Sequence, residues 1–145
     1  MSAYVVVDAG FIFASLFKEA YTAQINAKLA QWELQQISLA APVLLQYEVN
    51  AVIPKAVYQN RLAPDRAQQL LTTAASIAIA YFIDPPLHLR AFELATQFNR
   101  PRTYDTQYLA LAEKLNSEFW TTDEKLYNAV QNNLGYIRWI GNSPT

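Results

Sequence analysis

The 145-residue chain has no cysteine, one histidine and only three glycines. Without cysteine it can form neither a disulfide nor a thiolate zinc site, and it has no cysteine nucleophile. His88 alone cannot supply the two imidazoles of an HExxH zinc site. The glycines, Gly10, Gly135 and Gly141, are spaced too widely for a GxxxxGK[S/T] loop or a GxGxxG turn. The common glycine-rich nucleotide-binding loops are therefore absent.

Charge and long hydrophobic runs are also scarce. Charged residues make up 16% of the chain and the net charge is −1, so the protein lacks the bulk positive charge of many nucleic-acid binders, although a local basic rim remains compatible. The longest apolar run, residues 74–82, is interrupted by Ser76 and falls short of the roughly 18 residues of a membrane span. The N-terminal residues have no basic segment, and their apolar run stops at Asp8. We therefore expect no signal peptide, no membrane association and a cytoplasmic location.

Apolar residues, in contrast, are abundant. They form 52% of the chain, which excludes an intrinsically disordered protein. The length suits one domain with a substantial core. We expect a single domain over residues 1–141 and a loose C-terminal tail over residues 142–145. The apolar content is also compatible with a surface that a partner covers.

Short apolar runs alternate with helical patterns along the chain. Strands are predicted over residues 4–7, 37–40, 76–82, 118–121 and 136–140, and helices over residues 11–17, 20–36, 43–59, from 64 onwards, 87–98, 105–115 and 126–130. Pro42 is expected to open the helix that follows the second strand, and Pro54 to kink or break that helix. The alternation predicts an α/β fold with a largely parallel sheet.

Four acidic residues lie near the predicted carboxyl ends of strands. Asp8 follows the first strand and Asp123 the fourth, while Glu48 and Asp105 lie near the starts of two helices. In open α/β sheets this edge is where ligands bind, so we expect the four side chains to converge there. At an effective dielectric of 20, two carboxylates 4 Å apart repel by about 4 kcal/mol. Either some of them are protonated or a divalent cation binds, and an all-oxygen set favours Mg²⁺ or Mn²⁺.

Each acid also has a purely structural interpretation. Asp105 and Asp123 are typical helix N-caps, and each taken alone fits that role better than metal binding. Glu48 fits a solvated helix position, although its neighbours are apolar. Asp8 is the hardest to explain in this way, because an aspartate at the end of a buried strand has no evident local purpose beyond a turn hydrogen bond. Taken together, the four acids favour a metal site.

Four segments contain these acids: VVVDA at residues 5–9, APVLLQYEV at 41–49, TYDTQYLALAE at 103–113 and WTTDEKL at 120–126. In their order and spacing they resemble the PIN-domain ribonucleases, most closely the VapC-type toxins of prokaryotic toxin–antitoxin pairs. The resemblance covers nearly the whole chain. It implies a three-layer α/β/α sandwich around a mostly parallel central sheet. It implies a catalytic cluster for Mg²⁺ or Mn²⁺ formed by Asp8, Glu48, Asp105 and Asp123, with the Thr121 hydroxyl close to the metal.

The activity implied by this resemblance is metal-dependent hydrolysis of RNA phosphodiester bonds by the toxin of a toxin–antitoxin pair. The implied partners are RNA, a cognate antitoxin protein and a second copy of the chain in a homodimer. Arg100, Arg102 and Lys125 lie close in sequence to the acids and are the candidate RNA-binding residues. Gly10 departs from the family pattern, in which a small hydroxyl residue is common after the first aspartate.

Other functions remain open. One is a catalytically silent PIN-like module that binds RNA or protein. An acidic-pocket phosphotransfer domain fits less well, because a dehalogenase-like phosphatase requires a second aspartate where Gly10 stands, and the acid pair and late lysine of a receiver domain are not evident.

We expect His88 at the surface or at a helix cap. Several aromatic side chains are able to stack on bases, although we expect them in the core or in an interface. They are Phe11, Phe13, Phe17, Tyr47 and Tyr58.

Overall fold

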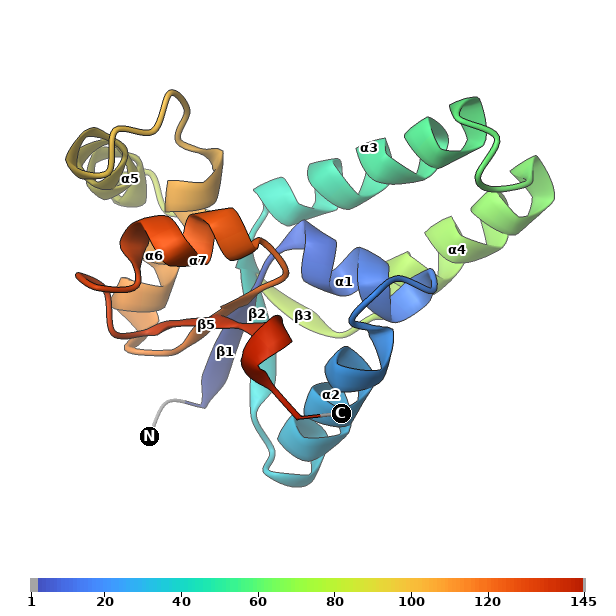
Figure 1. The fold of residues 1–145 in the computed structure, drawn as a ribbon, viewed down its shortest axis with the longest axis horizontal. Coiled ribbons are helices and arrows are strands. Elements are labelled where there is room, and N and C mark those ends of the chain that lie inside the picture. The colour runs from blue at the N-terminus through green and yellow to red at the C-terminus, as the bar shows by residue number, and fades with distance from the viewer. Residues whose placement is uncertain (1–2, 145) are drawn as a thin grey trace.

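The computed structural model describes residues 3–144; residues 1, 2 and 145 of the predicted domain and tail lie outside the described part. Five parallel strands form one sheet in the order β3-β2-β1-β4-β5 (Figure 1). They are β1 (Tyr4–Val7), β2 (Ser38–Pro42), β3 (Ile79–Phe82), β4 (Phe119–Thr121) and β5 (Ile137–Trp139). The central strand carries the run Val5, Val6 and Val7, each 2% exposed or less, because helices cover both faces of the sheet.

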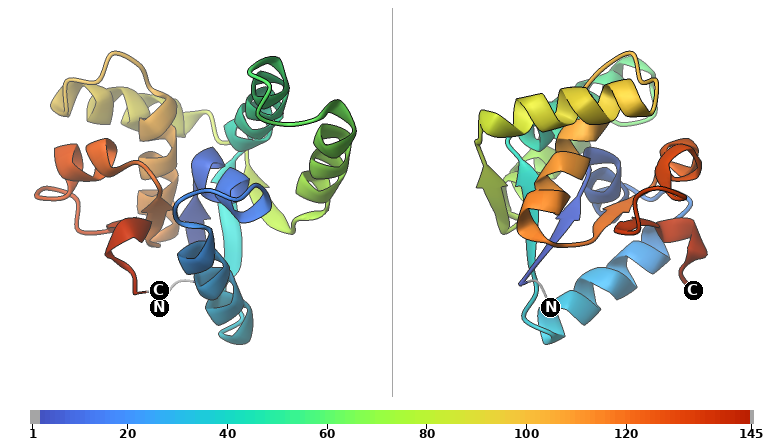
Figure 2. Two further views of the ribbon diagram at one scale, coloured as in Figure 1. Left: turned by 45° about the vertical axis from the view of Figure 1, so that its right-hand side comes forward. Right: turned by 90° about the vertical axis from the view of Figure 1, so that its left-hand side faces the viewer.

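Helices cover the sheet on both sides, which confirms the predicted three-layer α/β/α sandwich (Figure 2). Helices α1–α4 lie on one face and α5–α7 on the other. Their bounds are α1 (Ala9–Leu16), α2 (Thr22–Leu34), α3 (Leu44–Tyr58), α4 (Pro64–Ser76), α5 (Pro86–Gln97), α6 (Tyr104–Leu115) and α7 (Glu124–Val130). A 3₁₀ turn, η1 (Ile140–Asn142), follows β5, so Asn142, the first residue of the predicted tail, lies in a helical turn. None of the helices between residues 3 and 144 has the length and apolar character to cross a membrane.

The order of the strands places a topological switch point between β1 and β4. The chain passes from β1 to β2 through α1 and α2 on one face, and from β3 to β4 through α5 and α6 on the other. Because parallel connections are right-handed, this change of face accompanies a reversal in the direction of winding. Ligands of open α/β sheets bind at such a point, outside the carboxyl ends of the strands. Asp8 and Thr121 are located there, at the ends of β1 and β4.

Both predictions based on proline need correction. Pro42 is the last residue of β2, opposite Phe82 of β3, and α3 begins only at Leu44. Proline is tolerated at that strand end because no ladder donor is required there. Helix α3 runs through Pro54 without a break. Pro54 lies on the exposed side of α3, opposite the buried Val49 and Ile53, so water can satisfy the carbonyl that its missing N–H leaves free.

The third predicted strand is also shorter than expected. Residues 76–78 do not belong to it, because α4 continues through Ser76 and the strand starts at Ile79. Small side chains dominate this stretch of the sequence, and they pack as well on the end of a helix as in a strand. The apolar run alone therefore does not show where α4 ends and where β3 begins.

Candidate metal centre

Asp8 leaves the central strand and begins α1. The Phe11 N–H donates to its Oδ1 (2.9 Å), and the Thr121 hydroxyl donates to its Oδ2 (2.5 Å). The first bond makes Asp8 the N-cap of α1, which is the kind of local hydrogen bond that the sequence left open for this residue beside a metal site. Burial of the carboxyl group raises its pKa to about 7; the two hydrogen bonds oppose this rise, and the charges of Asp105 and Glu48 add to it.

Thr121 connects Asp8 to the end of the neighbouring strand. This threonine is fully buried, donates to Asp8 and accepts a hydrogen bond from the Asp123 N–H (2.9 Å). The Asp123 side chain is exposed and accepts from the Leu126 N–H (3.0 Å), so it caps α7, as its structural interpretation predicted. One hydroxyl therefore fixes the relative positions of Asp8 and the Asp123 backbone.

Glu48 is held by a residue that sequence reasoning missed. The hydroxyl of Tyr108, on α6, donates to Glu48 Oε1 (2.6 Å) from the other layer of helices. Partial burial raises the pKa of Glu48; the bond from Tyr108 opposes this rise and the Asp105 charge adds to it. A signal was present in the sequence, since Tyr108 follows Asp105 by three residues and so lies on the same face of its helix.

Asp105 is paired with one of the predicted RNA-binding residues. Arg100 Nη2 lies 3.3 Å from Asp105 Oδ2 in a partly exposed ion pair. Thr103 rather than Asp105 occupies the N-cap position of α6, so the capping interpretation of Asp105 is wrong. Arg102 and Lys125, the other two basic candidates, are exposed, and neither has an ion-pair partner among the described residues.

A threonine fills the space that a side chain at Gly10 would take. A Cβ built on Gly10 would lie 2.6 Å from Thr122 Oγ1, which is closer than two such atoms approach in proteins, and 3.7 Å from Asp8 Oδ1. A side chain at this position would therefore require the Thr122 hydroxyl to move away. As the structure stands, Thr122, the residue directly after β4, places its hydroxyl against Gly10, two residues after Asp8. Nothing in the sequence pattern indicated this role for Thr122.

The structure thus brings Asp8, Glu48 and Asp105 within electrostatic range of one another, with Asp123 at the exposed margin. Among residues 3–144, no three acidic or imidazole side chains are close enough to hold one metal ion as they stand. Ligation of an ion by three of them therefore requires side-chain rotation. The chemistry of the donor set fits Mg²⁺ or Mn²⁺, because it consists of carboxylate and hydroxyl oxygens. The raised pKa values of Asp8 and Glu48 fit carboxylates that a cation would stabilise.

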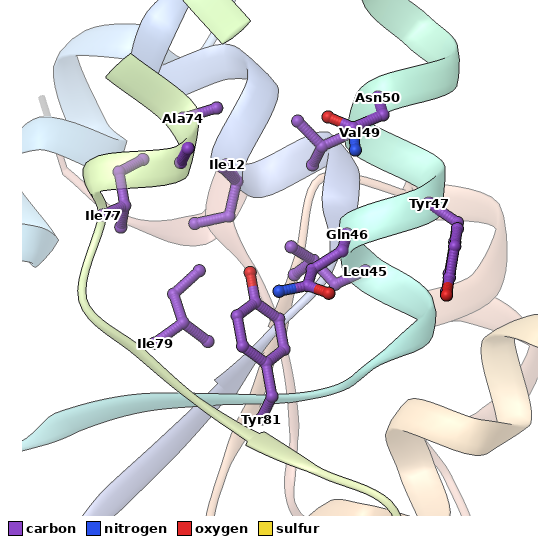
Figure 3. A pocket seen from close by; sticks show the side chains of 11 residues that line it. Ile12, Leu45, Gln46, Tyr47, Val49, Asn50, Ala74, Ile77, Ile79 and Tyr81 are labelled. Carbon is purple, nitrogen blue, oxygen red and sulfur yellow. The ribbon is translucent and has the colours of Figure 1, made fainter. Parts of the chain in front are cut away.

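A separate hollow of about 330 Å³ opens between α3, α4 and β3 (Figure 3). Inside it the Tyr81 hydroxyl points toward the Gln46 amide, and burial raises the pKa of that tyrosine. Aliphatic side chains such as Ile12 and Ile79 form its walls. No acidic residue lines this hollow, so it does not extend the carboxylate site.

Comparison with known proteins supplies a family. The family model of the PIN domain matches residues 6–133. Nine solved chains match, among them the crystal structure of PAE2754 from Pyrobaculum aerophilum, with a TM-score of 0.69 and 21% sequence identity. The similarity covers 95% of this chain and 90% of that chain, and at this identity it shows the fold alone. None of the curated proteins that were compared matches the chain.

Proposed function

The chain belongs to the PIN-domain family, whose members are generally nucleases, and from this premise we propose that it is a metal-dependent endoribonuclease. The observation that carries the proposal is the meeting of Asp8, Glu48 and Asp105 at one edge of the sheet. They come from the end of β1, from α3 and from α6; the charges of Asp105 and Glu48 raise the pKa of Asp8, and the charge of Asp105 also raises the pKa of Glu48. Such a grouping of like charges destabilises the fold unless a bound cation compensates for it.

Asp8, Glu48, Asp105 and Asp123 would hold Mg²⁺ or Mn²⁺, with the Thr121 hydroxyl beside them. A bound divalent ion there would supply Lewis-acid polarisation of the RNA phosphate and a lower pKa for a reacting water. The protein positions the ligands. Thr121 fixes Asp8, and Tyr108 fixes one oxygen of Glu48 while the other oxygen has no hydrogen-bond partner among the described residues.

The basic residues divide into two groups in this proposal. Arg102 and Lys125 are exposed next to Asp105 and Asp123, where they would contact RNA phosphates on either side of the cleaved bond. Arg100 neutralises Asp105 as the structure stands. Once a cation takes over that neutralisation, the Arg100 guanidinium is available for a phosphate oxygen.

Within this function we propose the role of a toxin that acts in the cytoplasm, forms a homodimer and is neutralised by a cognate antitoxin. Several large apolar side chains support the existence of protein partners, since they are more than half exposed. They are Ile83 (79%), Leu89 (65%) and Phe92 (62%) at or just before α5, and Leu34 (87%) at the end of α2 on the other face of the sheet (Figure 2). The three at α5 are the ones that favour association with another protein chain, because a group of exposed apolar side chains, unlike a single one, marks an interaction surface.

The test uses purified protein that is free of antitoxin. It is incubated with total RNA and with a tRNA mixture in Mg²⁺, in Mn²⁺ or in EDTA, beside Asp8→Asn and the control Asp65→Asn, an exposed carboxyl on α4 outside the cluster. Discrete fragments that require metal, persist in the control and vanish in Asp8→Asn are the expected result. Activity that survives in both Asp8→Asn and Asp105→Asn, with unchanged metal dependence, would remove the basis of the proposal. Absence of both cleavage and metal-induced stabilisation would favour the silent binding module.

A further inference from the structure

A cavity of about 260 Å³ lies at the carboxyl ends of β2 and β3, between the first turns of α3, α5 and α6. Pro42 and Phe82 come from the strand ends, Leu44 from α3 and Leu87 from α5. Neither the acidic cluster nor the hollow beside Tyr81 accounts for it, because the three share no lining residue. The cavity is smaller than the pockets of about 300–1,000 Å³ that take drug-sized ligands, so it suits one small, flat group.

This cavity adjoins the carboxylates through two of its walls. Tyr104 lines it and directly precedes Asp105 in α6. Leu44 lines it one helical turn before Glu48 in α3, and residues four apart on a helix are neighbours at about 5–6 Å. A group in contact with Tyr104 is therefore one residue away from Asp105, and a group in contact with Leu44 is one helical turn away from Glu48. Neighbouring parts of one substrate molecule can span these separations.

The lining combines an aromatic ring with a polar edge. Tyr104 is 55% exposed, although it is a large aromatic residue. On the same face of α6, three residues further on, Gln107 Nε2 lies 3.0 Å from His88 Nδ1 of α5 in a hydrogen bond. This bond orients the Gln107 carboxamide and leaves its Oε1 without a partner among the described residues. An aromatic face beside an oriented amide is how proteins bind an unpaired base, by stacking and by hydrogen bonds to the base edge.

We propose that this cavity binds one unstacked nucleobase of the RNA beside the phosphate that is cleaved. Tyr104 stacks on the base, and Gln107, positioned by His88, recognises its edge. The inference rests on the proposed ribonuclease function and specifies its substrate as RNA with an unpaired base at the cleavage site. Charge is compatible with a nucleotide as the occupant, because Asp84 in the cavity lining is paired with Lys114, and Arg102, two residues before Tyr104, is exposed and has no ion-pair partner among the described residues.

The experiment measures binding of four fluorescein-labelled octamers by anisotropy in Mg²⁺: oligo(A), oligo(C), oligo(U) and an abasic octamer with the same number of phosphates. Gel electrophoresis after each titration confirms that the probe is intact. The variants are Tyr104→Ala, Tyr104→Phe, Gln107→Ala and Arg102→Ala. Tyr58→Ala is the matched control, since Tyr58 is 88% exposed at the far end of α3. Circular dichroism checks that each variant is folded.

We expect the wild type to bind at least one base-bearing octamer about tenfold or more tightly than the abasic octamer, as one base–aromatic stack predicts. Tyr104→Ala removes most of this preference with an unchanged salt dependence, whereas Tyr104→Phe and Tyr58→Ala retain it. Gln107→Ala reduces the differences among the three bases. Arg102→Ala instead lowers the salt dependence for every octamer, because it removes a phosphate contact.

Three results overturn the base site, and they are distinguishable. If the wild type cleaves RNA in a metal-dependent way but Tyr104→Ala binds every octamer as the wild type does, the nuclease stands and the base site is refuted. If the wild type cleaves RNA yet binds none of the octamers better than the abasic one, the base site is equally refuted. If the wild type neither cleaves RNA nor binds any octamer, the proposed function fails together with the base site.

Discussion

Replacing Asp8 by asparagine should stabilise the metal-free protein at neutral pH. The Asp8 carboxyl group is partly buried and lies near Glu48 and Asp105, so the folded state holds its negative charge at a cost. Asparagine keeps the oxygen that accepts from the Phe11 N–H and is as good an N-cap as aspartate. The substitution therefore removes the charge and retains the bond that begins α1, while the oxygen that accepts from the Thr121 hydroxyl becomes an NH₂ donor, which offsets part of the gain.

The size of the effect follows from the pKa of Asp8, which burial raises from 3.8 to about 7. Between these values the folded protein binds more protons than the unfolded chain, so the free energy of unfolding falls as pH rises. The stability that is linked to the protonated Asp8 carboxyl group is fully present below about pH 4 and is lost as the pH rises through about 7. This rise in the pKa, by roughly three, corresponds to a loss of about 4 kcal/mol in the free energy of unfolding at high pH.

The assay is urea denaturation from pH 5 to pH 8 in EDTA, followed by tryptophan fluorescence. The wild type should lose stability steeply across this range, and Asp8→Asn should lose much less and be the more stable protein at pH 8. Asp65→Asn should behave as the wild type, and saturating Mg²⁺ should flatten the profiles of these two proteins, since a bound cation stabilises the ionised carboxylate that both retain. Parallel pH profiles for wild type and Asp8→Asn in EDTA would falsify the argument that burial of this carboxyl group destabilises the fold.

Three further predictions address the neighbours of Asp8. Arg100→Gln removes the counter-charge of Asp105, so calorimetry should show tighter Mg²⁺ binding than in the wild type; weaker binding would mean that Arg100 helps to organise the site. Tyr108→Phe leaves the partly buried glutamate of α3 without its donor and should cost about 1.5–3 kcal/mol in urea denaturation at pH 7; an unchanged midpoint would show that this bond contributes nothing. Gly10→Ala should stabilise the Thr122→Ala variant by up to about 1 kcal/mol but not the wild type, where Thr122 occupies the space; equal effects in the two backgrounds would refute that contact.

Much of the fold could be predicted from the sequence because its elements have local causes. The run Val5-Val6-Val7 predicts a strand buried on both faces, and the alternation of strands and helices predicts a parallel sheet. The two errors over proline arose where the tertiary surroundings decide. Whether a proline interrupts a helix depends on which side of the helix it faces, and Pro54 faces solvent.

The candidate site was predictable to the extent that it depends on strand ends. Asp8 and Asp123 could be placed at one edge of the sheet because each follows a parallel strand, whereas the role of Thr121 came from the resemblance to PIN-domain ribonucleases. The contacts of Tyr108 with Glu48 and of Thr122 with Gly10 could not, because the partners lie 60 or more residues apart and meet only once both layers of helices have packed. Sequence spacing reports neighbours along one element, whereas these contacts join different elements.

The bonds that hold the carboxylates leave room for a cation. An ionised carboxylate has about four acceptor positions. Asp8 uses one on each oxygen, for the Phe11 N–H and for the Thr121 hydroxyl, and Glu48 uses one for Tyr108. Each carboxylate therefore has acceptor positions left for a metal ion beside its structural hydrogen bonds. Because no three acidic side chains among residues 3–144 lie close enough to share one ion as they stand, binding by three of them needs movement at the site, and relief of the charge repulsion favours that movement.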